Sequence, residues 1–105
     1  MSGADRVVIA VLTYRRVDRL ARLLPLLLEQ ADGVGADVLV VDNDPGGSAG
    51  SVAAAHPVRY VQEPRPGIAA ARNRALDEAG DAAALVFIDD DELPGDGWLA
   101  HLVGA

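Results

Sequence analysis

The sequence predicts a Rossmann-like α/β domain, an open parallel sheet of four strands with helices on both faces. Short apolar runs alternate with longer helical stretches, which is the order of βαβ units. The first, second and fourth runs resemble strands buried on both faces, whereas the third alternates like an edge strand. Because crossovers are right-handed, the simplest strand order is 3-2-1-4, with a switch point between strands one and four. The strands are expected at residues 7–12, 37–42, 58–62 and 84–88.

The helical stretches are marked by apolar periodicity and by helix-starting or helix-breaking residues. Asp18 is expected to cap a helix with leucines on one face, and Pro25 inside this helix is expected to bend it. Ser48 is expected to start a short helix, and an alanine-rich helix is expected over residues 68–79. A last helix is expected to begin near Trp98.

Size and composition limit the classes of protein that this chain can form. Its 105 residues, half of them apolar, fit one domain spanning 1–105. The absence of cysteine and lysine excludes disulfides, zinc–thiolate sites, cysteine nucleophiles and Schiff-base lysines. A net charge of −7 repels a phosphate backbone, so nucleic acid is not an expected partner. No apolar run approaches the roughly 20 residues needed to cross a bilayer, and a cytoplasmic location is therefore expected.

Each predicted strand ends abruptly in polar or charged residues. In open parallel sheets, ligands bind beyond the carboxyl ends of the strands at the switch point, so these ends are candidate site residues. The alternative is that the strands end in ordinary solvated loops. The four polar segments are Thr13-Tyr14-Arg15, Asp42-Asn43-Asp44, Glu63-Pro64-Arg65 and Asp89-Asp90-Asp91-Glu92.

The acidic segment after the fourth strand is the strongest indication of a site. Adjacent carboxylates repel one another, so a compensating charge is expected beside them. With strand geometry, Asp89 and Asp91 would face one ligand while Asp90 pointed elsewhere. Two such carboxylates suit Mg²⁺ or Mn²⁺, which complete their coordination with substrate phosphates and water. A solvated acidic turn is the alternative.

Three further positions offer contacts to a nucleotide. Asp42 can accept a hydrogen bond from a base or a ribose, or it can instead close an Asx-turn. The helix that starts after Gly67 presents free N–H groups to an anion. Arg72 lies in the same helix and is either a ligand contact or a surface arginine.

Four sequence blocks, in this order and spacing, resemble family 2 glycosyltransferases, which are inverting, metal-dependent enzymes with the GT-A fold. The resemblance covers nearly the whole chain, and the blocks together are far more specific than any one of them. They are VIAVLTYRR at 8–16, VVDN at 40–43, GIAAARN at 67–73 and FIDDDELP at 87–94.

At the base end of the site, the resemblance implies five nucleotide contacts. Thr13 and Arg15 would lie beside the base, Asp42 would recognise it, and Arg72 would brace that end of the pocket. Tyr14 would be a further nucleotide contact.

At the diphosphate end, the resemblance implies roles for three carboxylates. Asp89 would approach the ribose, Asp90 would be the variable middle residue of the nucleotide-binding motif, and Asp91 would bind the metal together with Asp89. The cofactor would be Mn²⁺ or Mg²⁺, and it would offset the charge that builds on the departing nucleoside diphosphate. Trp98 would serve packing.

The chain departs from the family in length, because catalytic domains of this class are considerably longer. It therefore resembles the first, donor-binding half of a GT-A fold, either as a fragment or as a short relative. No residue matches the family's general base, so no glycosyl transfer is expected from this chain alone; Glu92 and Asp96 are the first residues to examine if turnover occurs. The alternatives are a non-catalytic nucleotide- and metal-binding module, and a nucleotidyltransferase, whose usual basic glycine-rich loop is missing.

The resemblance also implies partners. Family frequency favours a UDP-sugar as donor, with a saccharide or a lipid-linked molecule as acceptor and a peripheral location at the inner membrane surface for a longer protein. The fourth strand has nothing in the chain to pair with its outer edge, so self-association through this strand is a further prediction.

Overall fold

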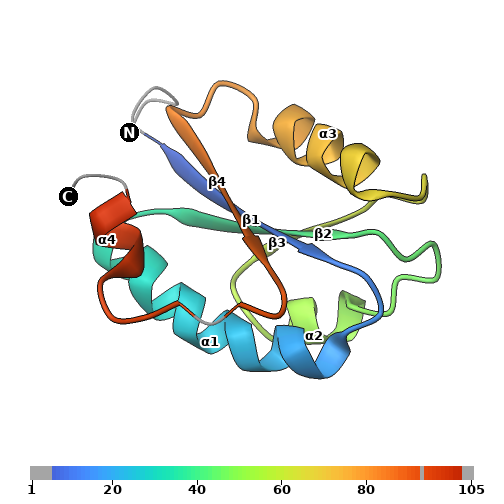
Figure 1. Cartoon of the computed structure of the whole chain (residues 1–105), viewed down its shortest axis with the longest axis horizontal. Helices are drawn as coiled ribbons and strands as arrows, with labels where there is room; N and C mark the ends of the chain where they lie inside the picture. Colours follow the sequence, from blue (N-terminus) through green and yellow to red (C-terminus); the bar gives the residue numbers. More distant parts are fainter. Residues whose placement is uncertain (1–5, 93, 103–105) are drawn as a thin grey trace.

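The computed structural model, which describes residues 6–92 and 94–102, confirms the parallel sheet and its strand order, β3-β2-β1-β4 (Figure 1). The strands are β1 (Val7–Thr13), β2 (Asp37–Asp42), β3 (Arg59–Gln62) and β4 (Ala84–Asp89). The helices are α1 (Val17–Val34), α2 (Gly50–Ala54), α3 (Ile68–Ala79) and α4 (Trp98–Leu102).

The register of the sheet brings the carboxyl ends of its strands to one edge. Thr13 at the end of β1 pairs with Asp42 at the end of β2, and Asp42 pairs with Gln62 at the end of β3. Asp89 at the end of β4 pairs with Leu12. The polar segments that follow these strands therefore start side by side, as the sequence predicts.

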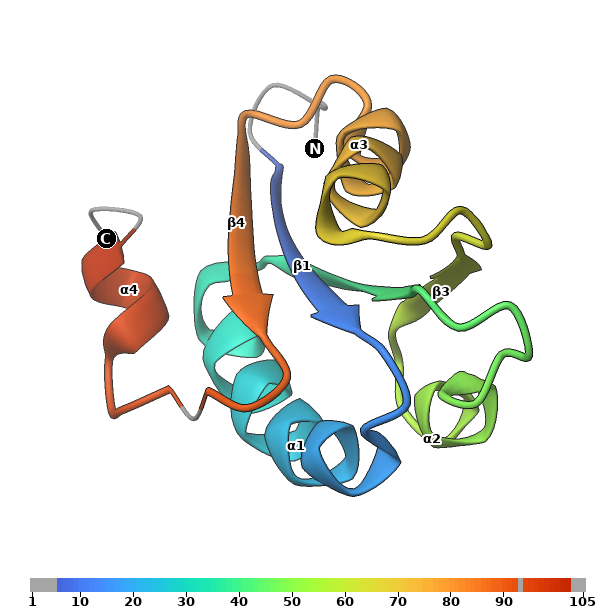
Figure 2. The same ribbon diagram turned by 45° about the vertical axis from the view of Figure 1, so that its right-hand side comes forward.

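Helices cover both faces of the sheet, and the two faces differ in what covers them. Figure 2 shows α3 alone on one side and α1, α2 and α4 on the other. Ile9 and Val11 of β1 pack toward α1, whereas Val8 and Ala10, which alternate with them, pack toward α3. The stripe of α1 that is buried against the sheet consists of Leu20, Leu23, Leu24, Leu27 and Ala31. On α3 the buried residues are Ala71, Ala75 and Ala79, whose small side chains allow a close approach.

The starts of two helices differ from the prediction. α1 begins at Val17, with Arg16 in the N-cap position and no side-chain cap; Asp18 lies in the first turn, where its charge favours the helix dipole. α1 continues through Pro25, which is exposed. α2 begins at Gly50, after Ser48, whose backbone N–H is bonded to a carboxylate of the preceding loop.

β4 differs from the prediction of a strand covered on both faces. Only Ile88 is buried in this strand, and Phe87 is 36% exposed. The physical reason is that β4 lies at the edge of the sheet while α3 packs over β1 and β2. Trp98 of α4 packs against the core, as predicted. Among the helices in the described ranges, none combines the length and the apolar character needed to cross a membrane.

Candidate functional site

A cavity of about 620 Å³ lies at the edge where the parallel strands end. It is lined by the β1–α1 loop, the β2–α2 loop, the segment before α3 and the turn after β4. Six of the residues proposed from sequence are among its lining residues: Thr13, Tyr14, Arg15, Asp89, Asp90 and Asp91. Two others, Asp42 and Arg72, are not among them. The cavity is therefore at the switch point between β1 and β4, where the sequence predicts a ligand.

The β1–α1 loop places Arg15 in an uncommon conformation. Arg15 has a φ of 53°, the left-handed region that side chains other than glycine rarely adopt. Its Nε donates to Asp44 Oδ1 at 3.3 Å, and its guanidinium lies 5.1 Å from the centre of the Tyr14 ring. The interaction between Arg15 and Asp44 thus links the β1–α1 loop to the β2–α2 loop and helps to hold Arg15 in this conformation.

Asp44, the anchor of Arg15, is itself held by its own loop. Its carboxylate accepts hydrogen bonds from the backbone N–H groups of Gly46 and Ser48 at 3.0 and 3.3 Å. Hydrogen bonds from Ser48, then from the Gly46 backbone, lower the pKa of Asp44 below its usual 3.8 against the opposing effect of burial. Asp44 therefore stays ionised beside Arg15 at neutral pH.

The turn after β4 differs from the alternation expected for a D-x-D motif in a strand. β4 ends at Asp89, and Asp90 and Asp91 lie in a turn. Asp90 points inward: it is 5% exposed, and its Oδ2 accepts a 2.9 Å hydrogen bond from Thr13 Oγ1. The reason is that β4 ends at Asp89, so strand alternation does not continue through Asp90 and Asp91, and the middle carboxylate turns toward β1.

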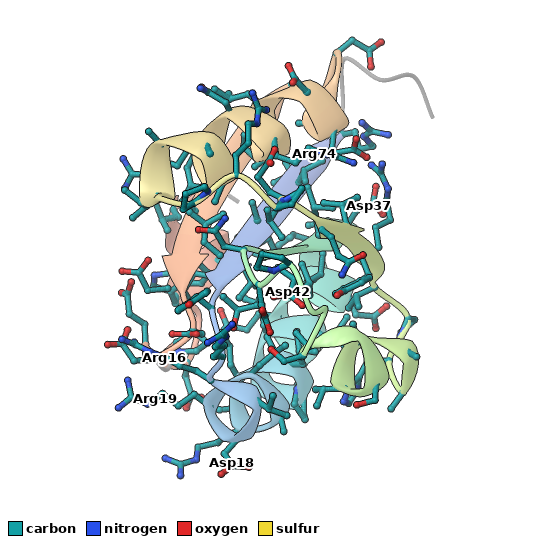
Figure 3. All side chains as sticks on the ribbon, turned by 90° about the vertical axis from the view of Figure 1, so that its right-hand side faces the viewer. Arg16, Asp18, Arg19, Asp37, Asp42 and Arg74 are labelled. Carbon is teal, nitrogen blue, oxygen red and sulfur yellow. The ribbon has the colours of Figure 1, made fainter. Side chains whose placement is uncertain are left out.

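The compensating charge expected beside these carboxylates is supplied by two arginines. Arg16 Nη1 lies 3.4 Å from Asp90 Oδ1 and 3.8 Å from Asp91 Oδ2, and Arg19 Nη1 lies 3.6 Å from Asp91 Oδ2. Asp91 remains half exposed. Figure 3 shows Arg16 and Arg19 near the N-terminal end of α1. Neither arginine was predicted as a site residue, although Arg16 directly follows the first polar segment and ends the block at 8–16.

Asp42 is fully buried, and its carboxylate accepts hydrogen bonds from the loop that follows it and from β3. Its Oδ1 accepts from the backbone N–H of Asp44 at 3.0 Å, which is the Asx-turn alternative. Its Oδ2 accepts from the Ala49 N–H at 3.0 Å and from the Tyr60 hydroxyl at 2.7 Å. Burial, and then the hydrogen bond to Asp42, raise the pKa of Tyr60. The geometry thus favours a scaffold role for Asp42 over direct recognition of a base.

Asn43, the next residue, lines the cavity and was not singled out from sequence. Its Nδ2 donates to the carbonyl oxygens of Glu63 and Arg65, both at 2.8 Å. Because both amide hydrogens are used in this way, Oδ1 is the end of the side chain left to accept from a ligand. The signals in the sequence are its place in the polar segment after the second strand and in the VVDN block at 40–43.

The segment before α3 forms an apolar wall of the cavity. Pro64 and Pro66 line it, and so do Gly67 and Ile68 at the N-terminal end of α3. Glu63 is buried, and hydrogen bonds from the Arg65 side chain and backbone hold its pKa below the usual value. The hydrogen bonds between Glu63 and Arg65 hold the backbone of the segment that contains Pro64 and Pro66.

Arg72 lies beside the cavity without lining it. Its guanidinium is 5.6 Å from the centre of the Phe87 ring on the exposed face of β4, a cation–π geometry. The bracing of a base by Arg72 remains a prediction.

The carboxylates present suit a hard divalent cation only in part. Over residues 6–92 and 94–102, no three His, Cys, Asp or Glu side chains converge on one metal position. Mg²⁺ and Mn²⁺, however, are held in nucleotide sites by one or two carboxylates, with phosphates and water as the other ligands. Asp89 and Asp91, both exposed and both lining the cavity, fit that requirement.

Fold and cavity define an α/β domain with a cavity at the topological switch point of an open parallel sheet, where ligands bind in such folds. The sequence profile of Glycosyl transferase family 2 matches residues 8–105. The chain therefore belongs to this family, and glycosyl transfer is its general activity class. A comparison with curated proteins gives no match.

Proposed function

We propose that the cavity binds a nucleoside-diphosphate sugar, with a UDP-sugar as the first candidate, as the donor site of an inverting, metal-dependent glycosyltransferase. The observation that supports this best is the convergence of Thr13, Arg15, Asp89 and Asp91 on one cavity at the switch point. A volume of about 620 Å³ lies within the range of small-molecule sites. The acceptor would be a saccharide or a lipid-linked molecule.

The base of the nucleotide is assigned to the end of the cavity near β2. Asn43 Oδ1 can accept a hydrogen bond from the imide N–H of a uracil, since its amide hydrogens are held by two backbone carbonyls. Pro64 and Pro66 offer flat apolar contact to the ring, and Tyr14 and Arg15 also line the cavity. Asp42 supports this end through the loop rather than by touching the base.

The diphosphate is assigned to the space between β1 and the turn after β4. Asp89 and Asp91 would hold a Mn²⁺ or Mg²⁺ ion, which would neutralise the charge on the departing nucleoside diphosphate. The first N–H groups of α3, which follow Gly67, add a positive dipole end to the cavity wall. Asp90 keeps the acidic turn against β1 through Thr13, so it positions Asp91.

Calorimetric titration with UDP, GDP and dTDP, each with and without Mn²⁺, tests the proposal. We expect UDP to bind most tightly and its affinity to rise with Mn²⁺. If none of the three binds in the presence of Mn²⁺, the donor-site assignment is wrong. Because no residue matches a general base, we expect no release of UDP from a UDP-sugar above spontaneous hydrolysis; such release would exclude the alternative, a module that only binds nucleotide and metal.

A further inference from the structure

We propose that Arg16 and Arg19 exchange partners when the donor site is loaded. They pair with Asp90 and Asp91 until a divalent cation takes the exposed carboxylate, and they then bind phosphate oxygens of the donor. This proposal rests on the proposed function and adds two anion-binding residues to it.

The geometry places both arginines on the carboxylate assigned to the cation. Arg16 and Arg19 approach the same oxygen, Asp91 Oδ2, at 3.8 and 3.6 Å. Arg16 also reaches Asp90 Oδ1 at 3.4 Å. A cation on Asp91 would bring two like charges close to both guanidinium groups, so binding of the cation must displace them.

The arginines have a second space to enter. Arg16 lines the main cavity. Arg19, with Arg22, Asp90 and Asp91, lines an adjoining cavity of about 390 Å³, and both cavities share the two carboxylates. A guanidinium that leaves Asp91 therefore remains beside the space assigned to the diphosphate.

The charge distribution of the chain supports the same conclusion. The net charge is −7, and four of the nine basic residues lie between positions 15 and 22. An acidic protein that binds a doubly charged phosphate ligand needs cationic groups near it, and this corner of the molecule concentrates them. Guanidinium groups bind phosphate oxygens in a bidentate manner, which favours arginine for this task.

The exchange is energetically accessible at Asp91 because both of its ion pairs are exposed, whereas Asp90, which is 5% exposed, keeps its hydrogen bond from Thr13. The side chains of Arg16 and Arg19 are 51% and 53% exposed, and that of Asp91 is 49% exposed. Ion pairs of this kind contribute little, so a divalent cation can replace them without disturbing the fold.

The test measures cation and nucleotide separately, without activity. Binding of Mn²⁺ alone is monitored by the loss of the paramagnetic resonance signal of free Mn²⁺. We expect Mn²⁺ to bind R19Q about two- to fivefold more tightly than it binds the wild type. UDP without metal should bind about two- to fivefold more weakly in the same variant. R16Q should show both changes. Opposite changes in the two affinities are not produced by a structural defect, which would weaken both.

R22Q is the matched control, because Arg22 lines the same adjoining cavity and, among the described residues, makes no ion pair. Its effect should be clearly smaller than that of R19Q. Equal effects of R22Q and R19Q would show that the affinities respond only to the loss of one positive charge near the site and not to partner exchange, and they would overturn the proposal. So would unchanged Mn²⁺ affinity in R19Q.

Asp91→Asn separates this proposal from the proposed function. If Asp91→Asn removes Mn²⁺ binding while R19Q leaves it unchanged, the metal site stands and the exchange fails. If neither the wild type nor any arginine variant binds Mn²⁺ or UDP, both the donor site and the exchange are wrong.

Discussion

The two acidic segments at the carboxyl edge of the sheet have similar sequences and different environments. At the end of β2 and in the β2–α2 loop, Asp42 and Asp44 are buried, and backbone N–H groups of this loop donate to both carboxylates. In the turn after β4, Asp91 is half exposed and pairs with flexible arginines. A carboxylate satisfied by fixed backbone donors acts as scaffold, whereas one satisfied by exposed side chains can change partners. Sequence alone does not separate these cases.

The largest loss of stability is expected when the buried carboxylate of Asp42 is removed. Asp42→Ala leaves the N–H groups of Asp44 and Ala49 and the hydroxyl of Tyr60 without their acceptor. We expect the free energy of unfolding, measured in urea, to fall by about 3 kcal/mol or more. Asp42→Asn, which keeps one acceptor oxygen, should lose less. An unchanged stability combined with a large loss of UDP affinity would instead support direct base recognition by Asp42.

Asp91→Asn should have the opposite profile. Because its ion pairs are exposed, we expect the free energy of unfolding to change by no more than about 0.5 kcal/mol. The strengthening of UDP binding by Mn²⁺ should disappear in calorimetry. A variant that still responds to Mn²⁺ as the wild type does would remove Asp91 from the metal site.

Asn43→Ala tests a residue that both bonds to the backbone of a neighbouring segment and lines the cavity. Loss of the acceptor proposed for the base should reduce UDP affinity by about 1–3 kcal/mol. Asn73→Ala is the matched control, because Asn73 is an exposed asparagine on α3 that does not line the cavity. Equal UDP affinities of the two variants would argue against a contact between Asn43 and the base.

Acid titration gives the smallest effect and tests the buried segment again. The pKa of folded Asp44 is lowered, so its contribution to stability is present above the unfolded value near 3.8 and is lost as the pH falls through the folded value. Thermal unfolding of the wild type should therefore become more pH-dependent below about pH 4 than that of Asp44→Asn. Parallel curves for the two proteins would show that the lowered pKa does not contribute to stability.

Self-association through the outer edge of β4, the last strand of the described sheet, remains a prediction. Phe87 is partly exposed on this strand, and Leu76 on α3 is 55% exposed. A long edge strand with apolar side chains is a template for pairing. Light scattering at micromolar concentration should show a dimer or a larger species, and a monomer would contradict the prediction.

Local pattern and general sheet rules predicted the fold because each strand and helix had its own signal. The apolar runs, the alanine-rich stretch of α3 and the rule for right-handed crossovers were enough to give the order β3-β2-β1-β4. The place of the cavity followed from the same rules, since parallel strands end at one edge. The start of α1 at Val17 and the start of α2 after Ser48 were missed, because both depend on hydrogen bonds that loops make after folding.

The sequence by itself determined the sheet, its order and the edge at which polar residues gather. Only the tertiary structure decided which of those polar residues face the cavity. Asp42 and Asn43 are adjacent, yet one is enclosed by its loop and the other reaches the cavity, because the carbonyls of Glu63 and Arg65 come from another strand end. Asp90 turns inward because Thr13, at the end of the neighbouring strand β1, donates a hydrogen bond to its carboxylate. Such choices depend on contacts between segments far apart in the chain, which no local pattern contains.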